Sequence, residues 1–386
     1  MLTKNINFKN FPYKKKNNTI NILNDIKKSY FLGKEKLLLT LSDQYKYSFN
    51  LKKISKLKKF QICRIIGMGG SALGAEAIYN FLKFKVKKKF IFFNNLRSGI
   101  NKKAKKNILN LIISKSGNTL ETITNLNILK INKNCIFITE NKNNYLKKIA
   151  EKIKCEIIEH KNYIGGRYSV LSEVGMLPAE LMGLNEKKFK QFNYLINNKI
   201  FINNLINNVE GILECIKKRK TNSVILNYDE DSQSLFYWYQ QLVAESLGKK
   251  SKGILPLVSL MPKDNHSLMQ LYLDGPKNNF FTFFDVFNQK SEKICKSSLL
   301  KSHSYLKNKS VNEIIFAQRL ATEKIFKKKK IPFRSFFVKK KNEQTLGELF
   351  CFFILETILL GRALKVNPFD QPSVELIKKE TRKFLI

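Results

Sequence analysis

The stretch Leu111–Thr124 reads LIISKSGNTLETIT, an apolar run followed by a cluster of hydroxyl groups with one lysine and one glycine. We expect a buried strand to end at Ile113 and a helix to begin near Leu120. The turn between them would place hydroxyls and an ammonium beside a helix N-terminus, whose unpaired N–H groups attract anions. A phosphate monoester suits such a turn. A turn that only caps its helix, with Thr119 as N-cap, would look the same, so both interpretations stay open at this point.

Short apolar runs alternate with helix-like stretches on both sides of this turn. In the first half, we predict strands at 60–66, 90–93, 110–113 and 135–139 and helices at 73–84 and 120–129. In the second half, we predict strands at 223–228, 280–286 and 333–338 and helices at 235–247, 312–326 and 346–364. Alternation at this spacing is typical of a parallel sheet covered by helices on both faces. The sequence therefore predicts an α/β fold with two domains of similar construction.

The domain boundary is predicted in the Asn-rich helical connector that follows residue 185. We assign residues 1–185 to the first domain, with an N-terminal extension before about Asn18 that we expect to be loosely ordered. Residues 186–386 form the second domain, which includes the connector helices. A final helix at 373–385 is expected to dock back on the body.

Composition narrows the classes of function. The net charge is +41, but the lysines occur in scattered short runs such as Lys87–Lys89 and Lys339–Lys341, so we expect no nucleic-acid partner. The longest apolar stretch is interrupted by Glu348 and Glu356, so we expect no membrane span. The six cysteines show no CxxC spacing and only three histidines are present, which favours reduced thiols, a cytoplasmic location and no metal site.

A glycine-rich loop, GMGGSALG at 67–74, follows the first predicted strand. It is similar to a dinucleotide-binding loop, but the second strand runs into Asn94 and Asn95 instead of an acidic residue that would hold a ribose. We therefore disfavour NAD. Gly70 would instead let a ligand approach the backbone, with the Ser71 hydroxyl directed at it.

Two further segments contain candidate polar groups. Arg167 follows two glycines, and a tight turn there would direct its guanidinium into a pocket, although an arginine after a turn is often only solvated. Gln241 and Glu245 share one face at the end of an aromatic helix. A carboxylate among aromatic residues can act as a base, but an exposed glutamate near a helix end is the common alternative.

The neighbouring sequence does not decide whether His266 and Lys378 have a functional role. His266 lies in a loop before a helical stretch, where histidines act in catalysis or simply pack or cap. Lys378 falls on the second turn of the final helix and would ordinarily be surface charge. His160 and His303 lie in lysine-rich, exposed-looking contexts.

Taken in order, these segments resemble the glucose-6-phosphate isomerase (phosphoglucose isomerase) family over about residues 65–378. The matching segments are GMGGSALG (67–74), SKSGNTLET (114–122), GGRYSVLSEVG (165–175), AESLGKKSKG (244–253), NHSLMQLYLDG (265–275) and NPFDQPSVELIK (367–378). The resemblance implies two sugar-isomerase (SIS) domains, each a flavodoxin-like αβα sandwich. It also implies interconversion of glucose 6-phosphate and fructose 6-phosphate without metal or organic cofactor.

The resemblance also implies roles for individual residues. Glu245 matches the base that moves a proton between C1 and C2 through a cis-enediol(ate), and Arg167 matches the cation that stabilises the enediolate. His266 and Lys378 match groups that assist ring opening, with His266 donated across the interface of a homodimer. The remaining matches are contacts to the substrate or its phosphate: Gly70, Ser71, Ser114, Lys115, Ser116, Thr119, Gln241 and Gln371.

The sequence departs from the family pattern near both cations. The residues before His266 are MPKDN, Ser373 replaces a usual glycine, and Ile377 replaces the glycine that usually precedes the lysine. Two alternatives remain: a dual phosphoglucose/phosphomannose isomerase, and a non-catalytic sugar-phosphate-binding protein. The joint presence of Glu245, His266 and Lys378 argues against the second.

Overall fold

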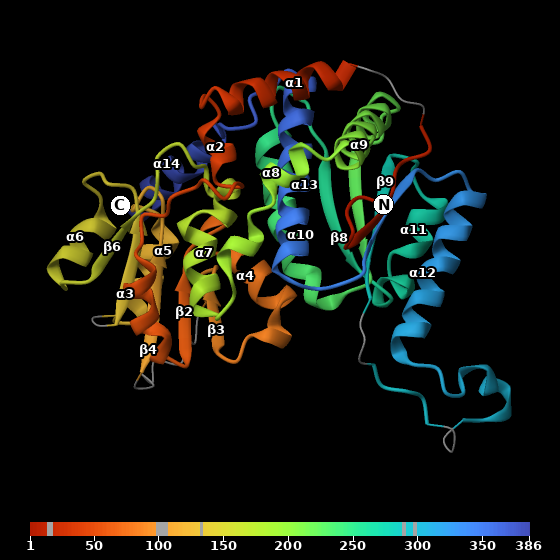
Figure 1. Ribbon diagram of the computed structural model, residues 1–386, viewed down its shortest axis with the longest axis horizontal. Helices are drawn as coiled ribbons and strands as arrows, with labels where there is room; N and C mark the ends of the chain where they lie inside the picture. The colour runs from red at the N-terminus through yellow and green to blue at the C-terminus, as the bar shows by residue number, and fades with distance from the viewer. Residues whose placement is uncertain (14–17, 98–106, 132–133, 288–290, 296–298) are drawn as a thin grey trace.

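The computed structural model describes residues 1–13, 18–97, 107–131, 134–287, 291–295 and 299–386. It contains two five-stranded sheets that lie side by side, each flanked by helices (Figure 1). Helix α4 of the first domain packs on helix α10 of the second, and the Asn80 amide donates to the Ser234 hydroxyl across this contact at 2.6 Å. The predicted α/β architecture is confirmed.

The first sheet is parallel and has the strand order β3-β2-β4-β5-β6. Its strands are β2 (Ile62–Ile66), β3 (Lys89–Phe93), β4 (Ile108–Ile113), β5 (Cys135–Thr139) and β6 (Glu156–Glu159). Its helices are α3 (Leu51–Lys56), α4 (Gly70–Phe81), α5 (Leu120–Ile128), α6 (Tyr145–Lys152) and α7 (Glu173–Leu181), with short 3-10 helices η1 (Leu57–Lys59), η2 (Lys83–Lys85) and η3 (Gly166–Leu171). Every residue of β4 is buried, as expected for a central parallel strand. The strand order reverses between β2 and β4, which is where open α/β sheets generally form a ligand-binding crevice, beyond the carboxyl ends of the strands.

The second sheet has the order β1-β10-β9-β7-β8. Its strands are β1 (Ile6–Lys9), β7 (Asn222–Asn227), β8 (Leu255–Leu260), β9 (Asn279–Val286) and β10 (Phe333–Val338). The longer helices beside it are α1 (Asn18–Phe31), α9 (Lys199–Lys217), α10 (Gln233–Leu247), α12 (Val311–Lys328) and α13 (Glu343–Ala363). The shorter helices of the chain are α2 (Lys36–Leu39), η4 (Glu186–Phe189), α8 (Phe192–Ile196), η5 (Glu230–Ser232), η6 (Lys263–His266), α11 (Met269–Asp274) and η8 (Lys301–Leu306). All strand pairs except β1–β10 are parallel.

The N-terminal residues differ from the prediction. Strand β1 pairs antiparallel with β10, so the first residues of the chain complete the second sheet instead of extending the first domain loosely. Four apolar side chains are buried there: Leu2, Ile6, Phe8 and Phe11. Because burial of apolar surface is favourable, these contacts stabilise the ordered segment. The boundary near residue 185 stays a prediction.

The two glutamates within the longest apolar stretch lie in helix α13. Eighteen of its residues are buried, and both carboxylates are satisfied internally. Glu348 accepts from the Thr3 hydroxyl at 2.7 Å, and Glu356 pairs with the buried Arg334 and accepts from Tyr239 at 2.8 Å. In the described part of the chain, no helix is long and apolar enough to cross a lipid bilayer.

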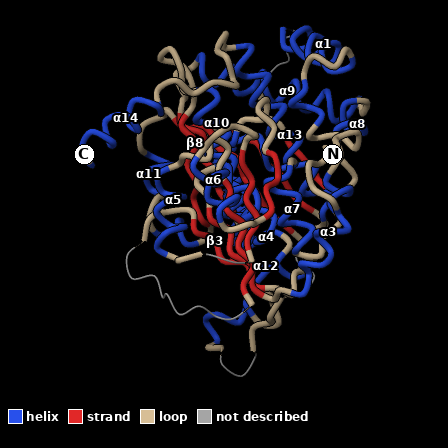
Figure 2. Tube along the Cα trace, turned by 90° about the vertical axis from the view of Figure 1, so that its left-hand side faces the viewer, coloured by secondary structure: helices blue, strands red, loops and turns tan. Residues whose placement is uncertain are grey.

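The C-terminal helix α14 (Val374–Leu385) forms where predicted but does not dock on the body. None of its residues is buried, and it projects away from the rest of the chain (Figure 2). Leu376, Ile377, Phe384 and Leu385 are exposed. The expectation of docking is therefore not met within this chain, since no described surface of it covers these side chains.

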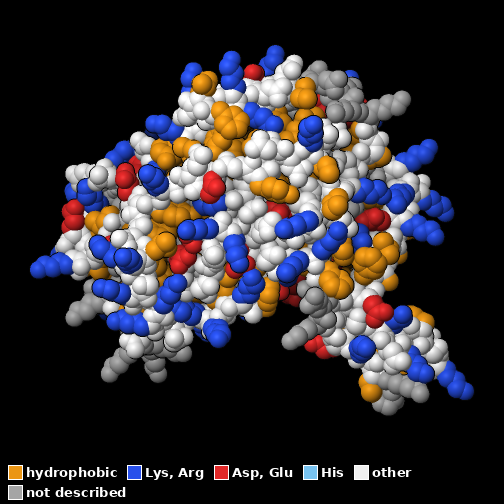
Figure 3. Space-filling view, viewed as in Figure 1, with side chains coloured by type: hydrophobic (Ala, Val, Ile, Leu, Met, Phe, Trp, Pro, Cys, Tyr) orange, Lys and Arg blue, Asp and Glu red, His pale blue; other side chains and the backbone are white. Residues whose placement is uncertain are grey.

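Positive charge is spread widely. On the face seen in Figure 3, lysine and arginine side chains are distributed over both domains, with acidic groups among them. This agrees with the scattered runs in the sequence.

Candidate active site

The crevice of the first domain is formed by the loops that follow β2 and β4. Gly67–Gly69 lead from β2 into α4, and residues 114–119 lead from β4 into α5. Because β2 and β4 are adjacent parallel strands, both loops reach the same edge of the sheet. The two loops that the sequence singled out are therefore brought together.

The Ser114 loop does not behave as a simple helix cap. Thr119 occupies the N-cap position of α5, but its side chain makes no capping bond. Its hydroxyl instead lies 2.8 Å from that of Ser114, which is 2% exposed. The first amides of α5 are thus left without a side-chain acceptor, which is the arrangement that binds an anion at a helix N-terminus.

The loop conformation depends on a glycine. Gly117 has φ +66°, and a Cβ placed there would lie 1.9 Å from the Oδ1 atom of Asn144. Asn144 in turn caps α6 by accepting from the Lys147 amide at 2.9 Å. The turn of the Ser114 loop is therefore locked against the start of the neighbouring helix.

Lys115 is held by groups that the sequence analysis did not single out. Its ammonium donates to the Asn162 carbonyl at 2.7 Å and lies 3.6 Å from the Glu140 carboxylate. Burial lowers the pKa of Lys115, while Glu140 opposes that shift. Glu140 directly follows β5, so its position at the same edge of the sheet could have been inferred from the strand order. His160 is 2% exposed, contrary to its expected exposure, and burial lowers its pKa.

The glycines after β2 are packed closely against other parts of the chain. A Cβ on Gly70 would lie 2.1 Å from the Gly166 carbonyl oxygen, and one on Gly69 would lie 2.6 Å from the Gln241 Nε2 atom. At both glycines, the side on which a Cβ would stand is therefore filled by protein. That a ligand approaches the backbone of Gly70 stays a prediction. Its absent side chain lets the turn before Arg167 approach α4. Ser71 is half-buried at the start of α4.

Arg167 is a buried cation, not a solvated one. It is 1% exposed, and its Nε donates to the Ser246 hydroxyl at 2.8 Å. One terminal nitrogen donates to Glu245 at 3.2 Å and to Gln371 at 2.6 Å. The other donates to the carbonyl oxygens of Pro368 at 2.6 Å and Asp370 at 3.0 Å. With all five N–H groups engaged, the guanidinium is fixed in position.

Glu245 lies between this arginine and a glutamine. One carboxylate oxygen accepts from Arg167, and the other accepts from the Gln241 amide at 2.8 Å. The side chain keeps 26% of its surface exposed. A charged carboxylate with fixed orientation and one open side can accept and return a proton, and the adjacent guanidinium can stabilise negative charge on an oxygen.

Two neighbours complete the setting of Arg167. The Tyr168 hydroxyl lies 2.9 Å from that of Ser246 and donates to the Pro368 carbonyl at 3.0 Å. Burial raises the pKa of Tyr168. Tyr168 directly follows Arg167, and Ser246 directly follows Glu245. Nothing in the sequence indicates that Tyr168 and Ser246 contact each other.

The structure does not bring His266 or Lys378 to Glu245. Both are exposed, and Lys378 pairs with Glu375 at 2.6 Å. His266 follows the carboxyl end of β8, whereas Glu245 lies near its amino end, where Gln240 donates to the Pro256 carbonyl at 2.8 Å. Six residues of strand span about 20 Å. Within one chain, His266 and Glu245 therefore lie at opposite ends of the strand.

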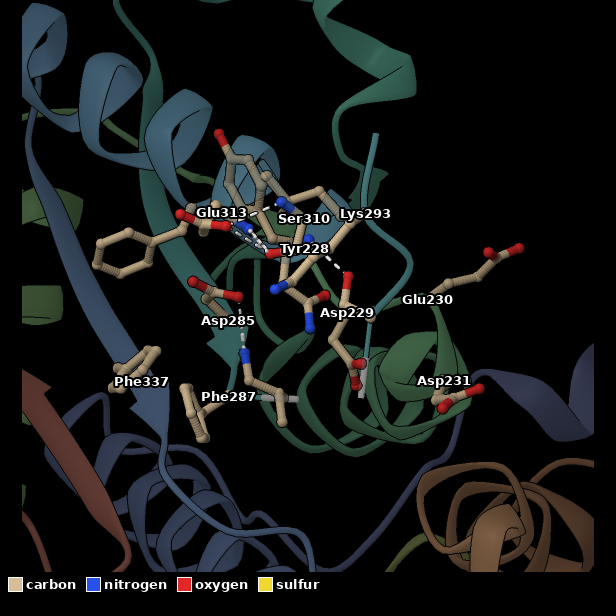
Figure 4. A pocket seen from close by; sticks show the side chains of 15 residues that line it. Tyr228, Asp229, Glu230, Asp231, Asp285, Phe287, Lys293, Ser310, Glu313 and Phe337 are labelled. Carbon is tan, nitrogen blue, oxygen red and sulfur yellow. Dashed lines mark hydrogen bonds between the residues drawn. The ribbon is translucent and has the colours of Figure 1, made fainter. Parts of the chain in front are cut away.

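A large cavity lies elsewhere, at the carboxyl ends of β7 and β9 in the second domain. It measures about 780 Å³, and its acidic lining includes Asp229, Glu230, Asp231, Asp285 and Glu313 (Figure 4). Asp229 pairs with Lys341 at 2.8 Å, and Asp285 pairs with Arg319 at 3.0 Å. None of the residues predicted for the substrate lines it. In the described part of the chain, no three metal-ligating side chains are grouped closely enough to hold a metal ion.

Comparisons with known proteins indicate the family of the chain. The model of the family described as phosphoglucose isomerase matches residues 53–254. Glucose-6-phosphate isomerase of Methanocaldococcus jannaschii is 32% identical over 351 residues, with 86% of each chain covered. The enzyme of the same name from Mycoplasmopsis pulmonis is 32% identical over 364 residues, covering 86% of this chain and 84% of its own.

Solved structures agree in fold. A hypothetical protein of Thermus thermophilus superimposes with a TM-score of 0.82 at 24% identity, covering 95% of both chains. A glucose-6-phosphate isomerase of Chlamydia trachomatis gives 0.71 at 18% identity, covering 91% of this chain and 73% of its own. The family model and the sequence relatives together establish that this chain belongs to the phosphoglucose isomerase family.

Proposed function

We propose that the chain is an aldose–ketose isomerase that interconverts glucose 6-phosphate and fructose 6-phosphate. The main support for this proposal is the position of Glu245. Its carboxylate is hydrogen-bonded to Arg167 and Gln241 at the crevice that also contains the Ser114 loop. The family membership and the names of the sequence relatives support the same reaction.

The proposed chemistry uses two charged groups. The Glu245 carboxylate removes the proton from C2 of the open-chain aldose, and the electron pair moves to give a cis-enediolate. The proton then returns to C1. The C2 hydroxyl gives up its proton as it becomes the carbonyl, and O1 gains a proton to become a hydroxyl. Arg167 stabilises the negative oxygen of the intermediate, and its fixed hydrogen bonds mean that it need not reorganise during the reaction.

We assign the phosphate to the Ser114 loop. Ser71, Ser114, Ser116 and Thr119 would donate hydroxyl hydrogen bonds together with the free amides of α5. Lys115 adds positive charge from beside Glu140. Gln241 and Gln371, which contact Glu245 and Arg167, would face the sugar.

The test is turnover of fructose 6-phosphate coupled to detection of glucose 6-phosphate. Glu245→Gln keeps the shape of the side chain, and its kcat should fall about 1000-fold because a neutral amide is no base. The matched control is Glu76→Gln, a half-buried glutamate that accepts from Asn94 at 2.8 Å and lies outside the proposed chemistry. Equal activity of Glu245→Gln and wild type would refute the assignment. Binding of the sugar phosphate without turnover by wild type would instead indicate a non-catalytic binding protein.

We further propose a homodimer in which His266 reaches the site of the other copy. Within one chain, His266 and Glu245 lie near opposite ends of β8, a strand about 20 Å long. The exposed apolar side chains of α14 would also be buried if a second copy packed against them. Lys378 would then complete the site after α14 rearranges. A cytoplasmic location stays a prediction.

Mixing two inactive variants tests the shared site. Glu245→Gln and His266→Asn are each expected to be nearly inactive alone. If each site combines Glu245 of one copy with His266 of the other, a mixed dimer contains one intact site, and random mixing should restore about a quarter of wild-type activity. No recovery in dimers whose exchange is verified would contradict the shared site while leaving the isomerase proposal intact.

A further inference from the structure

A second polar cavity lies at the opposite end of β10 from the acidic cavity. It measures about 610 Å³, within the range of small-molecule sites. It forms where β1 ends, β10 begins and helices α9 and α12 terminate. Its lining consists of Lys9, Asn10, Pro12, Tyr13, Lys218, Lys220, Lys327, Lys330, Ile331, Pro332 and Phe333.

The lining of this cavity is basic. Five of its residues are lysines, and no carboxylate is among the described residues that line it. The nearby Glu214 is 3.5 Å from Lys218 and offsets one charge. A smaller cavity of about 210 Å³ shares Lys220 and Lys330 with it and adds Lys277 and Lys329. The two cavities share wall residues, and we call their combined lining the lysine recess. Within it, Lys329 is paired with Asp274 at 2.6 Å.

The lysines are close enough to repel one another. Burial lowers the pKa of Lys9, and the adjacent Lys327 lowers it further, while Glu323 opposes the shift. Lysines at the ends of α9 and α12 would be expected simply to complement the helix dipoles. Lys9 does not fit that explanation, because it belongs to strand β1, yet it faces Lys327 at the end of α12. Like charges brought together from separate elements are stabilised by a bound anion.

The walls of the recess are apolar and partly aromatic. The Lys9 ammonium lies 5.2 Å from the centroid of the Phe333 ring, and the Lys218 ammonium lies 4.5 Å from that of Tyr13. Ile331 and Pro332 are buried beside them. A bare inorganic anion would use the lysines but not these walls. A ligand with several phosphates and a flat apolar body would use both.

We propose that the lysine recess binds a nucleoside polyphosphate, with the phosphates on Lys9, Lys327 and Lys330 and the base against Tyr13. This site is separate from the Ser114 loop of the candidate active site. The proposal of nucleotide binding does not depend on the proposed isomerase activity.

The experiment is calorimetric titration of the full chain with ATP, without divalent metal and at low salt. Wild type should bind ATP, and the double variant Lys9→Met, Lys327→Met should bind at least 10-fold more weakly. The matched control is Lys52→Met, Lys53→Met, two exposed lysines of α3. A third variant, Lys115→Met, weakens the anion site of the first crevice and should leave ATP binding unchanged. Thermal unfolding should show that removing two mutually repelling lysines does not impair folding.

Inorganic triphosphate and Tyr13→Leu separate the contribution of the base. Triphosphate should bind more weakly than ATP, and Tyr13→Leu should weaken ATP binding about 10-fold while leaving triphosphate binding unchanged. Equal affinity for ATP and triphosphate would overturn the assignment of a nucleotide. Absence of ATP binding, or losses as large in Lys52→Met, Lys53→Met or Lys115→Met as in the recess variant, would overturn the site itself.

Discussion

The two domains have crevices at equivalent positions in their sheets but with opposite charge. In the first domain, the crevice lies between the carboxyl ends of β2 and β4, and in the second between those of β7 and β9. The first contains hydroxyls, helix amides and Lys115, whereas the second contains Asp229, Asp231 and Asp285. The shared topology thus provides a crevice in each domain, and the loops alone decide what it can bind.

Each crevice also has its own buried arginine, which allows the comparison to be tested directly. Arg167→Lys keeps the charge at the first site but cannot reproduce the five fixed hydrogen bonds. We expect kcat for fructose 6-phosphate to fall about 100- to 1000-fold.

The counterpart is Arg319→Lys in the second crevice, where Arg319 pairs with Asp285 and Glu323. It should lower the unfolding midpoint but leave kcat within about two-fold. A comparable loss of kcat in both variants would mean that the second crevice also takes part in catalysis.

The next largest effect is expected at Gly117. Gly117→Ala introduces a Cβ that meets Asn144 and also strains a φ of +66°. We expect a loss of about 3 kcal/mol in the free energy of unfolding together with a higher KM. Gly183 has φ +82° but open space around it, so Gly183→Ala isolates the backbone strain, which should cost about 1 kcal/mol. Urea denaturation of the two variants measures the difference, and equal losses would show that the contact with Asn144 is unimportant.

Ser114→Ala tests the hydroxyl of the first crevice alone. It removes the partner of Thr119, so KM for fructose 6-phosphate should rise about 10-fold while kcat stays within two-fold. Ser232→Ala is the control, because Ser232 donates to Asp229 in the second crevice. An unchanged KM in Ser114→Ala would place the phosphate elsewhere.

An effect smaller than that of Gly117→Ala concerns the pH dependence of the second crevice. Burial raises the pKa of Asp285 from 3.8 to about 6, although Arg319 opposes the shift. The folded protein therefore holds this proton more tightly than the unfolded chain. The resulting stabilisation is present at acidic pH and is lost as the pH rises from about 4 to about 6.

Asp285→Asn should remove that component of the pH profile. Relative to the variant, wild type should lose about 2 kcal/mol of unfolding free energy between pH 4.5 and pH 7. Urea titrations at both pH values measure this change. Parallel profiles would contradict a raised pKa, and turnover of the variant should stay close to that of wild type.

Much of this arrangement could be predicted from the sequence. The parallel strands are apolar runs bounded by turn residues, and β5 and β10 have the predicted bounds. Strand β8 was missed because Pro256 interrupts its pattern, and an edge position is where a sheet tolerates proline. Strand β1 is only four residues long, and its partner lies more than 320 residues away.

The candidate site could be predicted less completely than the fold. Periodicity placed Gln241 and Glu245 on one face, and the glycines before Arg167 indicated a turn into a pocket. Local sequence could not indicate that Gly70 makes room for the Gly166 carbonyl or that Glu140 holds Lys115, because these contacts depend on how distant loops meet. The structure does not bring His266 or Lys378 to Glu245, and their roles in the site stay predictions.

The pairing of β1 with β10 has a consequence for the order in which the protein can be made. Ile6 is opposite Val338, so the β1 segment has no strand to join until more than 320 further residues have been synthesised. The first sheet draws all its strands from residues 62–159 and can assemble long before that point. The β1 segment must therefore stay unpaired until β10 has been made, and its apolar side chains, Ile6 and Phe8, have to be kept from other contacts until then.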